Sequence, residues 1–506
     1  MNNTERVVEP GASRLLADIS RFLTGKGIAA YVVGGFVRDA LQHRVTADID
    51  IAVNGDAVPL APLLARSLGG TPVTLDEENR ISRIVLPDHT WEIDLTSFSG
   101  SIEEDLARRD FTIDAIAYPL DETIEAGFDI KRCIDPFHGL DDLRHKIIRA
   151  VSDTVFTEDP ARLLRALRIA AELGFSIEPE TGDLIRRDSG CIKNVAGERT
   201  REEFLRLLAQ PGAGELLFHM DRLGLLTALI PELAPARGTD QPIIHVWDVL
   251  EHSIRTVTAV EFVLHEGNWD HVPGDILSVV PWTSELREHF DQPVSHSSTR
   301  RTLLKLAALL HDIGKPRTKT LEPNGRARFL GHPEEGAATS AAILERLRFS
   351  RKELQLVTLL VKYHMRPTQM SNQGLPTARA IYRFFRDTGE AGTDILFICL
   401  ADHLATRGNT LDRNEWSGHA AMTAHVLAEH EERAVKPLET RLLSGHDIMQ
   451  IFTIEPGPRL GRLLEGLREA QAAGEVTGRQ QAIEYIHQMI TGPDRPEADG
   501  PSQGEL

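Results

Sequence analysis

The sequence predicts a mixed α/β head, in which helices pack on a mixed β-sheet, followed by an all-α neck and body and a further all-α domain. Short apolar runs typical of strands alternate with helical stretches over residues 12–150. After residue 157 the pattern becomes amphipathic and helical almost throughout, and residues 236–435 are rich in histidine. Because 506 residues are too many for one hydrophobic core, we expect several domains.

These patterns define the expected elements in order. Strands are expected in the runs IAAYVVGG, ADIDIAV, RISRIVL and TWEIDLTSF, and a helix in APLLARSLG. Amphipathic helices follow in ARLLRALRIAAELGF and REEFLRLLAQ, while a Pro-, Trp- and His-rich stretch at about 265–300 indicates a long loop or insertion. We therefore expect a head at 12–150, a helical neck and body at 151–235, a histidine-rich helical domain at 236–435, a C-terminal helical segment at 436–490 and a disordered tail at 491–506.

Composition narrows the class of protein. The net charge of −19 excludes a uniformly basic nucleic-acid binder, although it allows a local basic groove. The three cysteines are widely spaced and form no CxxC pair, which favours a reducing compartment over a disulfide framework. The N-terminal residues lack the regions of a signal peptide, and no apolar run approaches the roughly 18 residues that span a bilayer. We expect a cytoplasmic protein without a membrane segment.

A pair of glycines ends the first predicted strand. In VVGGFVRDAL, Gly34 and Gly35 stand where the strand opens into a helix, so that backbone N–H groups can approach a phosphate closely. Arg38, one turn into the helix, would add positive charge at the same place. A Gly-Gly pair alone is also consistent with a simple tight turn.

Carboxylates interrupt two of the predicted strands. Asp48 and Asp50 lie two apart in ADIDIAV and so share a strand face, and Asp94 interrupts TWEIDLTSF in the same way. An isolated pair of this kind often only caps a turn at the start of a strand. Three carboxylates beside a phosphate-binding turn, however, suit two Mg²⁺ ions and in-line phosphoryl or nucleotidyl transfer. Bound Mg²⁺ would offset the repulsion between the aspartates.

At this point the sequence resembles a known family, the class II tRNA nucleotidyltransferases and poly(A) polymerases that include the CCA-adding enzymes. GGFVRD followed by DID resembles the metal-binding motif of that family, and EEDLARRDFTIDAIAY its ribose-binding motif. The runs IDPFHGLDDLRHKIIRAV, FTEDPARLLRALRIAAELGF and AGERTREEF resemble the motifs that follow, in the same order.

The resemblance implies roles for individual residues. Asp48 and Asp50 would bind Mg²⁺, and the triphosphate and ribose would be held by Gly35, Arg38 and Arg109. The incoming base would pair with Asp159 and Arg162, followed on the same helix by Arg165 and Arg168, so that protein side chains select C or A. Without the resemblance, Asp159 reads as a helix N-cap and the arginines as a solvated stripe.

Two positions depart from the family pattern. The chain has Asp114 where the family usually has Asn, and TSF is followed almost at once by SGSIEEDL, where many complete CCA-adding relatives carry a longer flexible loop. A short connection resembles CC-adding members and also other branches. The sequence therefore leaves open whether CCA, CC, a single A or poly(A) is made.

A second resemblance lies in the histidine-rich region. LLKLAALLHDIGKP carries a His-Asp pair inside an apolar helix, and the order of the surrounding histidines resembles the HD-domain phosphohydrolases. In that family a first metal would be bound here by His252, His311, Asp312 and Asp402, and a second by His332 and His364. Imidazole and carboxylate ligands suit Mn, Fe, Ni, Co or Zn, with Mg as an alternative. His245 and His403 are expected to take no part.

Together these patterns predict an RNA nucleotidyltransferase that extends the 3′ end of tRNA with CTP, ATP or both and releases pyrophosphate. The acceptor arm would be gripped by a basic patch that includes Arg199, Arg201 and Arg206. A poly(A) polymerase is one alternative. An HD phosphohydrolase acting on nucleotides or cyclic phosphates is another, with the head only binding nucleotide or RNA. A non-catalytic RNA-binding module is a third.

Overall fold

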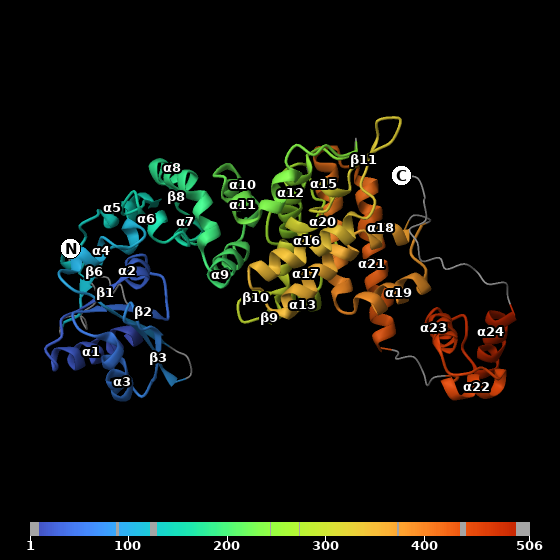
Figure 1. The fold of residues 1–506 in the computed structure, drawn as a ribbon, viewed down its shortest axis with the longest axis horizontal. Coiled ribbons are helices and arrows are strands. Elements are labelled where there is room, and N and C mark those ends of the chain that lie inside the picture. Colours follow the sequence, from blue (N-terminus) through green and yellow to red (C-terminus); the bar gives the residue numbers. More distant parts are fainter. Residues whose placement is uncertain are drawn as a thin grey trace. The chain divides into compact units, whose positions relative to one another are not determined.

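The computed structural model describes residues 10–87, 91–121, 129–242, 244–272, 274–371, 374–435 and 442–491. The chain forms two compact units, of which the first comprises Met1–Gln210 with Leu216–Pro231 and the second Pro211–Glu215 with Glu232–Leu506. In Figure 1 the first unit runs from blue to green and the second from green to red. The predicted tail at 491–506 lies, apart from its first residue, outside the described residues.

The head is built on one mixed sheet with the strand order β3-β4-β5-β2-β1-β6. Its strands are β1 (Ala30–Val33), β2 (Asp48–Val53), β3 (Thr71–Asp76), β4 (Ile81–Val85), β5 (Glu92–Ser97) and β6 (Ala117–Pro119). β2 pairs with β5 in parallel, and the other neighbours pair antiparallel. The mixed sheet predicted from the sequence is therefore confirmed.

Alternation along β2 and β5 explains why the sheet has one apolar and one polar face. Ile49, Ile51, Ile93 and Leu95 are at most 1% exposed, and the carboxylates lie between them on the other face. The helices of the head are α1 (Pro10–Thr24), α2 (Gly34–Leu41), α3 (Ala57–Leu68), α4 (Ile102–Leu106) and α5 (Gly139–His145). Of these, α3 packs against β3, β4 and β5. The polar face is thus left for chemistry.

The neck is helical, as predicted. It consists of α6 (Val155–Glu158), α7 (Arg162–Leu173), α8 (Pro179–Asp188), α9 (Gly197–Leu208), α10 (Ala213–Arg222), which belongs to both units, and α11 (Leu225–Leu229), together with a short parallel pair, β7 (Ile147–Ile148) and β8 (Ser176–Ile177). Helix α7 ends at Gly174, which adopts the left-handed conformation of a C-terminal stop. Helices α7 and α9 pack together.

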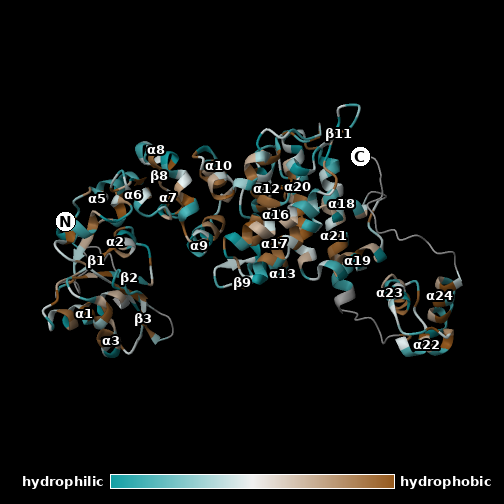
Figure 2. Cartoon of the chain, in the orientation of Figure 1, coloured by the Kyte–Doolittle hydropathy of each residue, from teal (hydrophilic) through white to brown (hydrophobic). Residues whose placement is uncertain are grey.

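Where the structure describes it, the second unit is all-α apart from two short hairpins. Its central helix, α20 (Ala391–Arg407), packs on α12 (Val249–Val263), α14 (Arg300–Leu310), α17 (Arg351–Tyr363) and α21 (Arg413–Val435). Figure 2 shows apolar residues along these packed helices. The remaining helices are α13 (Ser284–Asp291), α15 (Lys315–Thr318), α16 (His332–Arg346), α18 (Arg366–Ser371), α19 (Ala378–Thr388), α22 (Gly445–Phe452), α23 (Pro458–Ala472) and α24 (Arg479–Thr491).

The stretch at 265–300 is more ordered than the predicted loop. It contains α13 and the strands β9 (Pro293–Ser295) and β10 (Ser298–Thr299), because Trp269 and Phe290 are buried at 4% and 0% exposure and anchor it. A second hairpin, β11 (Thr320–Leu321) with β12 (Ala327–Arg328), precedes α16. Within the described residues, no helix is both long and apolar enough to cross a membrane.

Candidate functional site

The carboxylates of the head lie side by side on the polar face of the sheet. In the parallel pairing of β2 and β5, Asp50 is opposite Asp94 and Asp48 is opposite Glu92. Burial raises the pKa of Asp50 to about 6, with Asp94 adding to the rise and Arg109 opposing it. Burial and Glu92 likewise raise the pKa of Asp48, against the effect of Arg83. Such crowded carboxylates fit a divalent cation, which would offset their repulsion.

Asp94 is held by an arginine that the sequence reasoning did not single out. Arg83 on β4 donates from Nε to Asp94 Oδ1 at 2.7 Å and from Nη2 to Asp94 Oδ2 at 2.8 Å. Its third nitrogen pairs with Glu92. No sequence signal marks this arginine, because its partners are set by the register of β4 on β5.

The first residue of α2 has to be glycine for two reasons. Gly34 has φ +66°, a conformation that side chains disfavour. A Cβ atom at this position would also lie 2.8 Å from Arg109 Nη1 and 2.9 Å from Asp50 Oδ2. A side chain at this position would therefore clash with Arg109 and Asp50, which the sequence predicts to bind the triphosphate and a metal.

Arg38 faces the interior of the head. It donates from Nη1 to Asp114 Oδ1 at 2.8 Å and from Nε to Asp39 Oδ1 at 2.9 Å, and its side chain is 12% exposed. Asp114 is 2% exposed, and burial raises its pKa although Arg38 opposes the rise. This ion pair fastens α2 to the ribose motif, so Arg38 does not reach toward the cavity described next.

A cavity of about 510 Å³ lies between the head and the neck helices within the first unit. Predicted site residues Arg109, Asp159, Arg162 and Arg165 line it. Arg199 also lines it, although we predicted that residue for RNA binding. The acidic groups in the wall include Asp110, which pairs with Arg165 at 2.7 Å.

Asp159 is one of the carboxylates that line this cavity. Its Oδ2 accepts from Arg199 Nη2 at 2.8 Å and its Oδ1 accepts from the N–H of Ala161 at 3.2 Å. Burial raises the pKa of Asp159, but these bonds and Arg162, 4.0 Å away, outweigh that effect and lower it. Arg162 donates to the carbonyl of Arg108 at 2.8 Å. The Asp159 carboxylate and the Arg162 guanidinium therefore provide an acceptor and donors of the kind that can hydrogen-bond a nucleobase.

Three other predicted arginines lie outside the cavity wall. Arg168 is 7% exposed and is paired with Glu203 at 2.6 Å and Glu172 at 2.7 Å, which is a packing role in the neck. Neither Arg201 nor Arg206 is among the residues that line the cavity, and Arg206 pairs with Glu202 at 2.8 Å.

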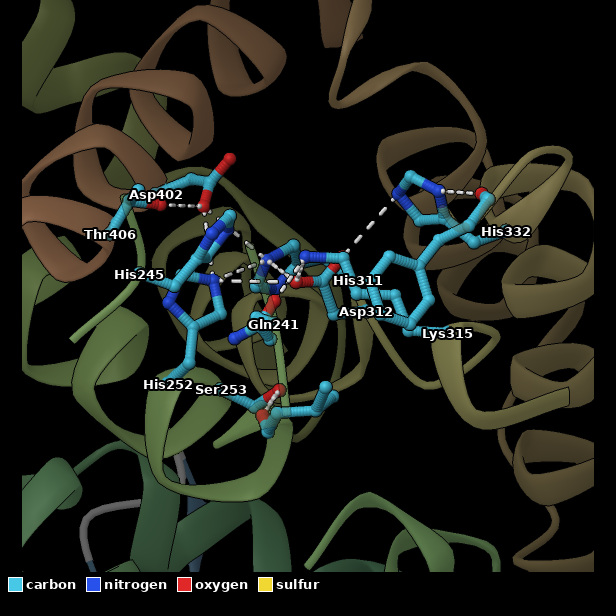
Figure 3. Close-up of polar contacts among 12 residues, drawn as sticks. Gln241, His245, His252, Ser253, His311, Asp312, Lys315, His332, Asp402 and Thr406 are labelled. Carbon is cyan, nitrogen blue, oxygen red and sulfur yellow. Dashed lines mark hydrogen bonds and ion pairs between the residues drawn. The ribbon is translucent and has the colours of Figure 1, made fainter. Parts of the chain in front are cut away.

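The second unit brings all six predicted HD residues together at the ends and middles of its central helices. Two overlapping groups place their ligand atoms within 4.8 Å of one another, His252 with His311 and Asp312, and Asp312 with His332 and His364. Asp402 Oδ1 lies 3.1 Å from His252 Nε2. Figure 3 shows the labelled members of this cluster converging on Asp312, which the two groups share.

The histidines are oriented as metal ligands. In His311, His332 and His364, the Nδ1 atom lies 2.7–2.8 Å from the carbonyl oxygen three residues earlier, which points Nε2 into the cluster. The Nε2 atoms of His332 and His364 are buried without a hydrogen-bond partner. Buried atoms without a partner are costly, so these residues fit a divalent metal.

The histidines of the cluster differ in their pKa values. Burial lowers the pKa of His311, but Asp312 and Asp402 outweigh it and raise that pKa to about 10. Burial, with the neighbouring His311 and His332, lowers the pKa of His364 to about 3. His364 is therefore neutral before a metal binds, whereas His311 would release its proton when it becomes a ligand.

Residues that we did not predict as metal ligands also contact the cluster. Lys315 Nζ forms an ion pair with Asp312 Oδ2 and donates a hydrogen bond to Gln241 Oε1, both at 2.6 Å. His245, which we expected to take no part, packs edge-on against His252 with ring centres 5.5 Å apart (Figure 3). His403 instead stacks on His419 with ring centres 4.5 Å apart.

Comparison with known families agrees with this arrangement. Residues 30–149 match the family described as "Poly A polymerase head domain". Residues 174–237 match "Probable RNA and SrmB- binding site of polymerase A", and residues 249–407 match the HD domain.

Relatives cover nearly the whole chain. The A-adding tRNA nucleotidyltransferase of Deinococcus radiodurans is 32% identical over 463 residues, covering 90% of this chain and 94% of that protein. The CC-adding enzyme of Thermus thermophilus is 33% identical over 465 residues, covering 90% and 93%.

Solved structures share the fold. The Thermotoga maritima CCA-adding enzyme complexed with tRNA has a TM-score of 0.61 at 20% identity, covering 96% of this chain and 97% of that one. A CCA-adding enzyme in complex with ATP has a TM-score of 0.63 at 20% identity with the same coverage.

Proposed function

The chain belongs to the tRNA nucleotidyltransferase family, and from this premise we propose that it adds CMP, AMP or both from CTP and ATP to the 3′ end of tRNA. Pyrophosphate is the other product. The observation that carries the proposal is the placement of Asp48, Asp50 and Asp94 on one sheet face, in the same unit as an arginine-lined cavity. Repair of tRNA ends would take place in the cytoplasm.

Each group has a place in this reaction. Asp48 and Asp50 would hold Mg²⁺, which when bound would lower the pKa of the attacking 3′-hydroxyl and neutralise the leaving pyrophosphate. The N–H groups at Gly34 and Gly35 and the guanidinium of Arg109 would hold the triphosphate. Asp94 would orient the attacking hydroxyl and accept its proton.

Base selection would fall to the neck. Asp159 offers an acceptor and Arg162 donors, and both line the cavity. A cytosine or adenine presents its amino group and ring nitrogen along one edge, which such a pair can match without a nucleic-acid template. Arg199 would keep Asp159 ionised and in place.

A product-length assay tests the proposal. We would incubate the protein with Mg²⁺ and tRNA transcripts ending at the discriminator base, at C or at CC, supply CTP and ATP singly and together, and sequence the products. Growth to CCA would identify a complete CCA-adding enzyme, a stop at CC a CC-adding enzyme, and growth of CC ends alone an A-adding enzyme. Long A tails would identify a poly(A) polymerase. No growth, with an Asp50→Ala control behaving identically, would reject nucleotidyl transfer.

The HD centre supports a second candidate function, hydrolysis of phosphate esters or cyclic phosphates. It rests on the buried Nε2 atoms of His332 and His364, which lack partners and face Asp312. The bound metal would be Mn, Fe, Ni, Co, Zn or Mg. Stripping the protein with a chelator and restoring one metal at a time, with nucleotides and cyclic nucleotides as substrates, tests this. Equal phosphate release by His364→Gln and the wild-type protein would reject it.

A further inference from the structure

The proposed reaction leaves Arg83 on β4 without a role, although this residue makes extensive contacts on the polar face. β4 and β5 are antiparallel neighbours in which Arg83 is directly opposite Asp94. The planar guanidinium binds both oxygens of Asp94, at 2.7 Å and 2.8 Å, and also pairs with Glu92. A two-bond fork of this kind fixes the carboxylate in direction as well as in place.

The three predicted site carboxylates of the head do not come close enough together to form one metal site, and one of them, Asp94, is held by Arg83. In the part of the chain that the structure describes, the groups of three whose ligand atoms all lie within 4.8 Å belong to the HD centre. Asp48, Asp50 and Asp94 do not form such a group, although Asp50 and Asp94 are direct neighbours in the sheet. Arg83 also places a positive charge near Asp48, whose pKa it lowers against the effects of burial and Glu92.

We propose that Arg83 is a positioning residue for nucleotidyl transfer: it holds Asp94 in a fixed orientation beside Asp50, so that the cation site of the free protein consists of Asp48 and Asp50. The inference rests on the proposed function. Asp94 is thereby kept for the attacking hydroxyl, and its negative charge is balanced until substrate arrives. Arg83 thus weakens the binding of free cations and fixes the orientation of Asp94 at the place where the 3′-hydroxyl would react.

The first measurement is Mn²⁺ binding to the full chain without nucleotide, by isothermal titration. The HD centre is a second candidate metal site, so the head component is defined as the part of the isotherm that Asp50→Asn removes. Arg83→Gln removes a positive charge and frees a carboxylate, and it should tighten this component roughly fivefold. Adding Asp94→Asn to that variant should return the affinity toward the wild-type value. Arg66→Gln, an equal charge change at an exposed residue of α3, should change nothing.

The second measurement is single-turnover nucleotide addition. Arg83→Lys keeps the charge but loses the fork, so its Mn²⁺ affinity should stay near wild type while the rate falls about tenfold. Melting curves confirm that each variant is folded. Wild-type affinity and rate in both Arg83 variants would overturn the proposal, as would tightening in Arg83→Gln that Asp94→Asn does not reverse. If the wild-type protein extends no RNA, the proposed function fails, while the Mn²⁺ titrations still decide whether Arg83 controls the cation site.

Discussion

Gly34 shows how little room the head site leaves at the scale of one residue. A Cβ atom added to Gly34 would collide with Arg109 and Asp50, and the φ angle of this residue is +66°. Gly34→Ala should therefore displace Arg109 and Asp50 together, the residues that we propose hold the triphosphate and a metal. We expect nucleotide addition to fall at least about 100-fold and stability to fall by about 1–3 kcal/mol.

The matched control for that change is Gly182→Ala on α8. No atom lies within 4 Å of a Cβ there, and the backbone is helical. Alanine should be neutral or stabilising by up to about 1 kcal/mol. Melting temperatures and single-turnover rates of the two variants check the comparison. Wild-type activity in Gly34→Ala would show that the turn relaxes without loss.

A second prediction at residue scale concerns Asp159. Asp159→Asn removes the negative charge and leaves one oxygen for the two donors Ala161 N–H and Arg199, and the new amide nitrogen offers donors in place of an acceptor. We expect kcat/KM for the preferred nucleotide to fall about 100-fold and discrimination between CTP and ATP to narrow, because a mismatched polar group is left unpaired. Competition between the two nucleotides on one tRNA end measures this. Unchanged preference would remove Asp159 from base selection.

At the scale of elements, the sequence predicted those strands whose alternation is enforced by burial. β2 and β5 place Ile49, Ile51 and Ile93 in the core and were predicted from this pattern. β3 was not, because it is largely exposed and its residues alternate weakly, and β6 is only three residues long. The Arg83 fork also escaped prediction, since side-chain pairs across strands depend on register, which a single sequence does not display.

The N-terminus of α17 supports a prediction about pH. Glu353 is 1% exposed, completes a capping box with Ser350, and accepts from Ser295 and Ser298 at 2.7 Å. Burial raises the pKa of Glu353, but these hydrogen bonds outweigh it and lower that pKa. A lowered folded-state pKa means that the carboxylate stabilises the fold above the unfolded value of about 4.3 and loses this effect as pH falls.

Glu353→Gln should therefore cost about 2 kcal/mol at pH 7, and less as the pH falls below about 4. Because α17 ends at His364, the variant should also bind metal at the HD centre more weakly. Melting temperatures at pH 7, 5 and 3 test the first point. Glu345→Gln, at an exposed residue of α16, is the control. A destabilisation that does not change with pH would assign the effect to packing.

At the scale of the whole molecule, the net negative charge is not spread evenly. The chain carries −19, yet arginines gather around one cavity in the first unit. Overall negative charge weakens non-specific association with nucleic acid. The five arginines of the cavity wall are matched by five carboxylates, so single guanidinium groups, and not a net positive cavity, would contact a triphosphate. Specific contacts at the site, more than bulk charge, should thus select the substrate.

The two centres lie in separate compact units, and this predicts that they can be inactivated separately. Asp50→Asn should abolish nucleotide addition, by at least about 1000-fold, because the cation site loses a ligand. Its metal content at the HD centre should be unchanged. Asp312→Asn, which alters the carboxylate shared by both ligand groups, should lose the HD metal and keep addition within about twofold.

Elemental analysis and the product-length assay on the same preparations check both halves of this prediction. Chelation should lower the melting temperature of the second unit in the wild-type protein, because the metal binds the folded state and stabilises it by mass action. In Asp312→Asn that chelator effect should be absent. The opposite result would be that Asp312→Asn loses nucleotide addition while its head remains folded and binds Mn²⁺. That result would show that nucleotide addition depends on the HD metal.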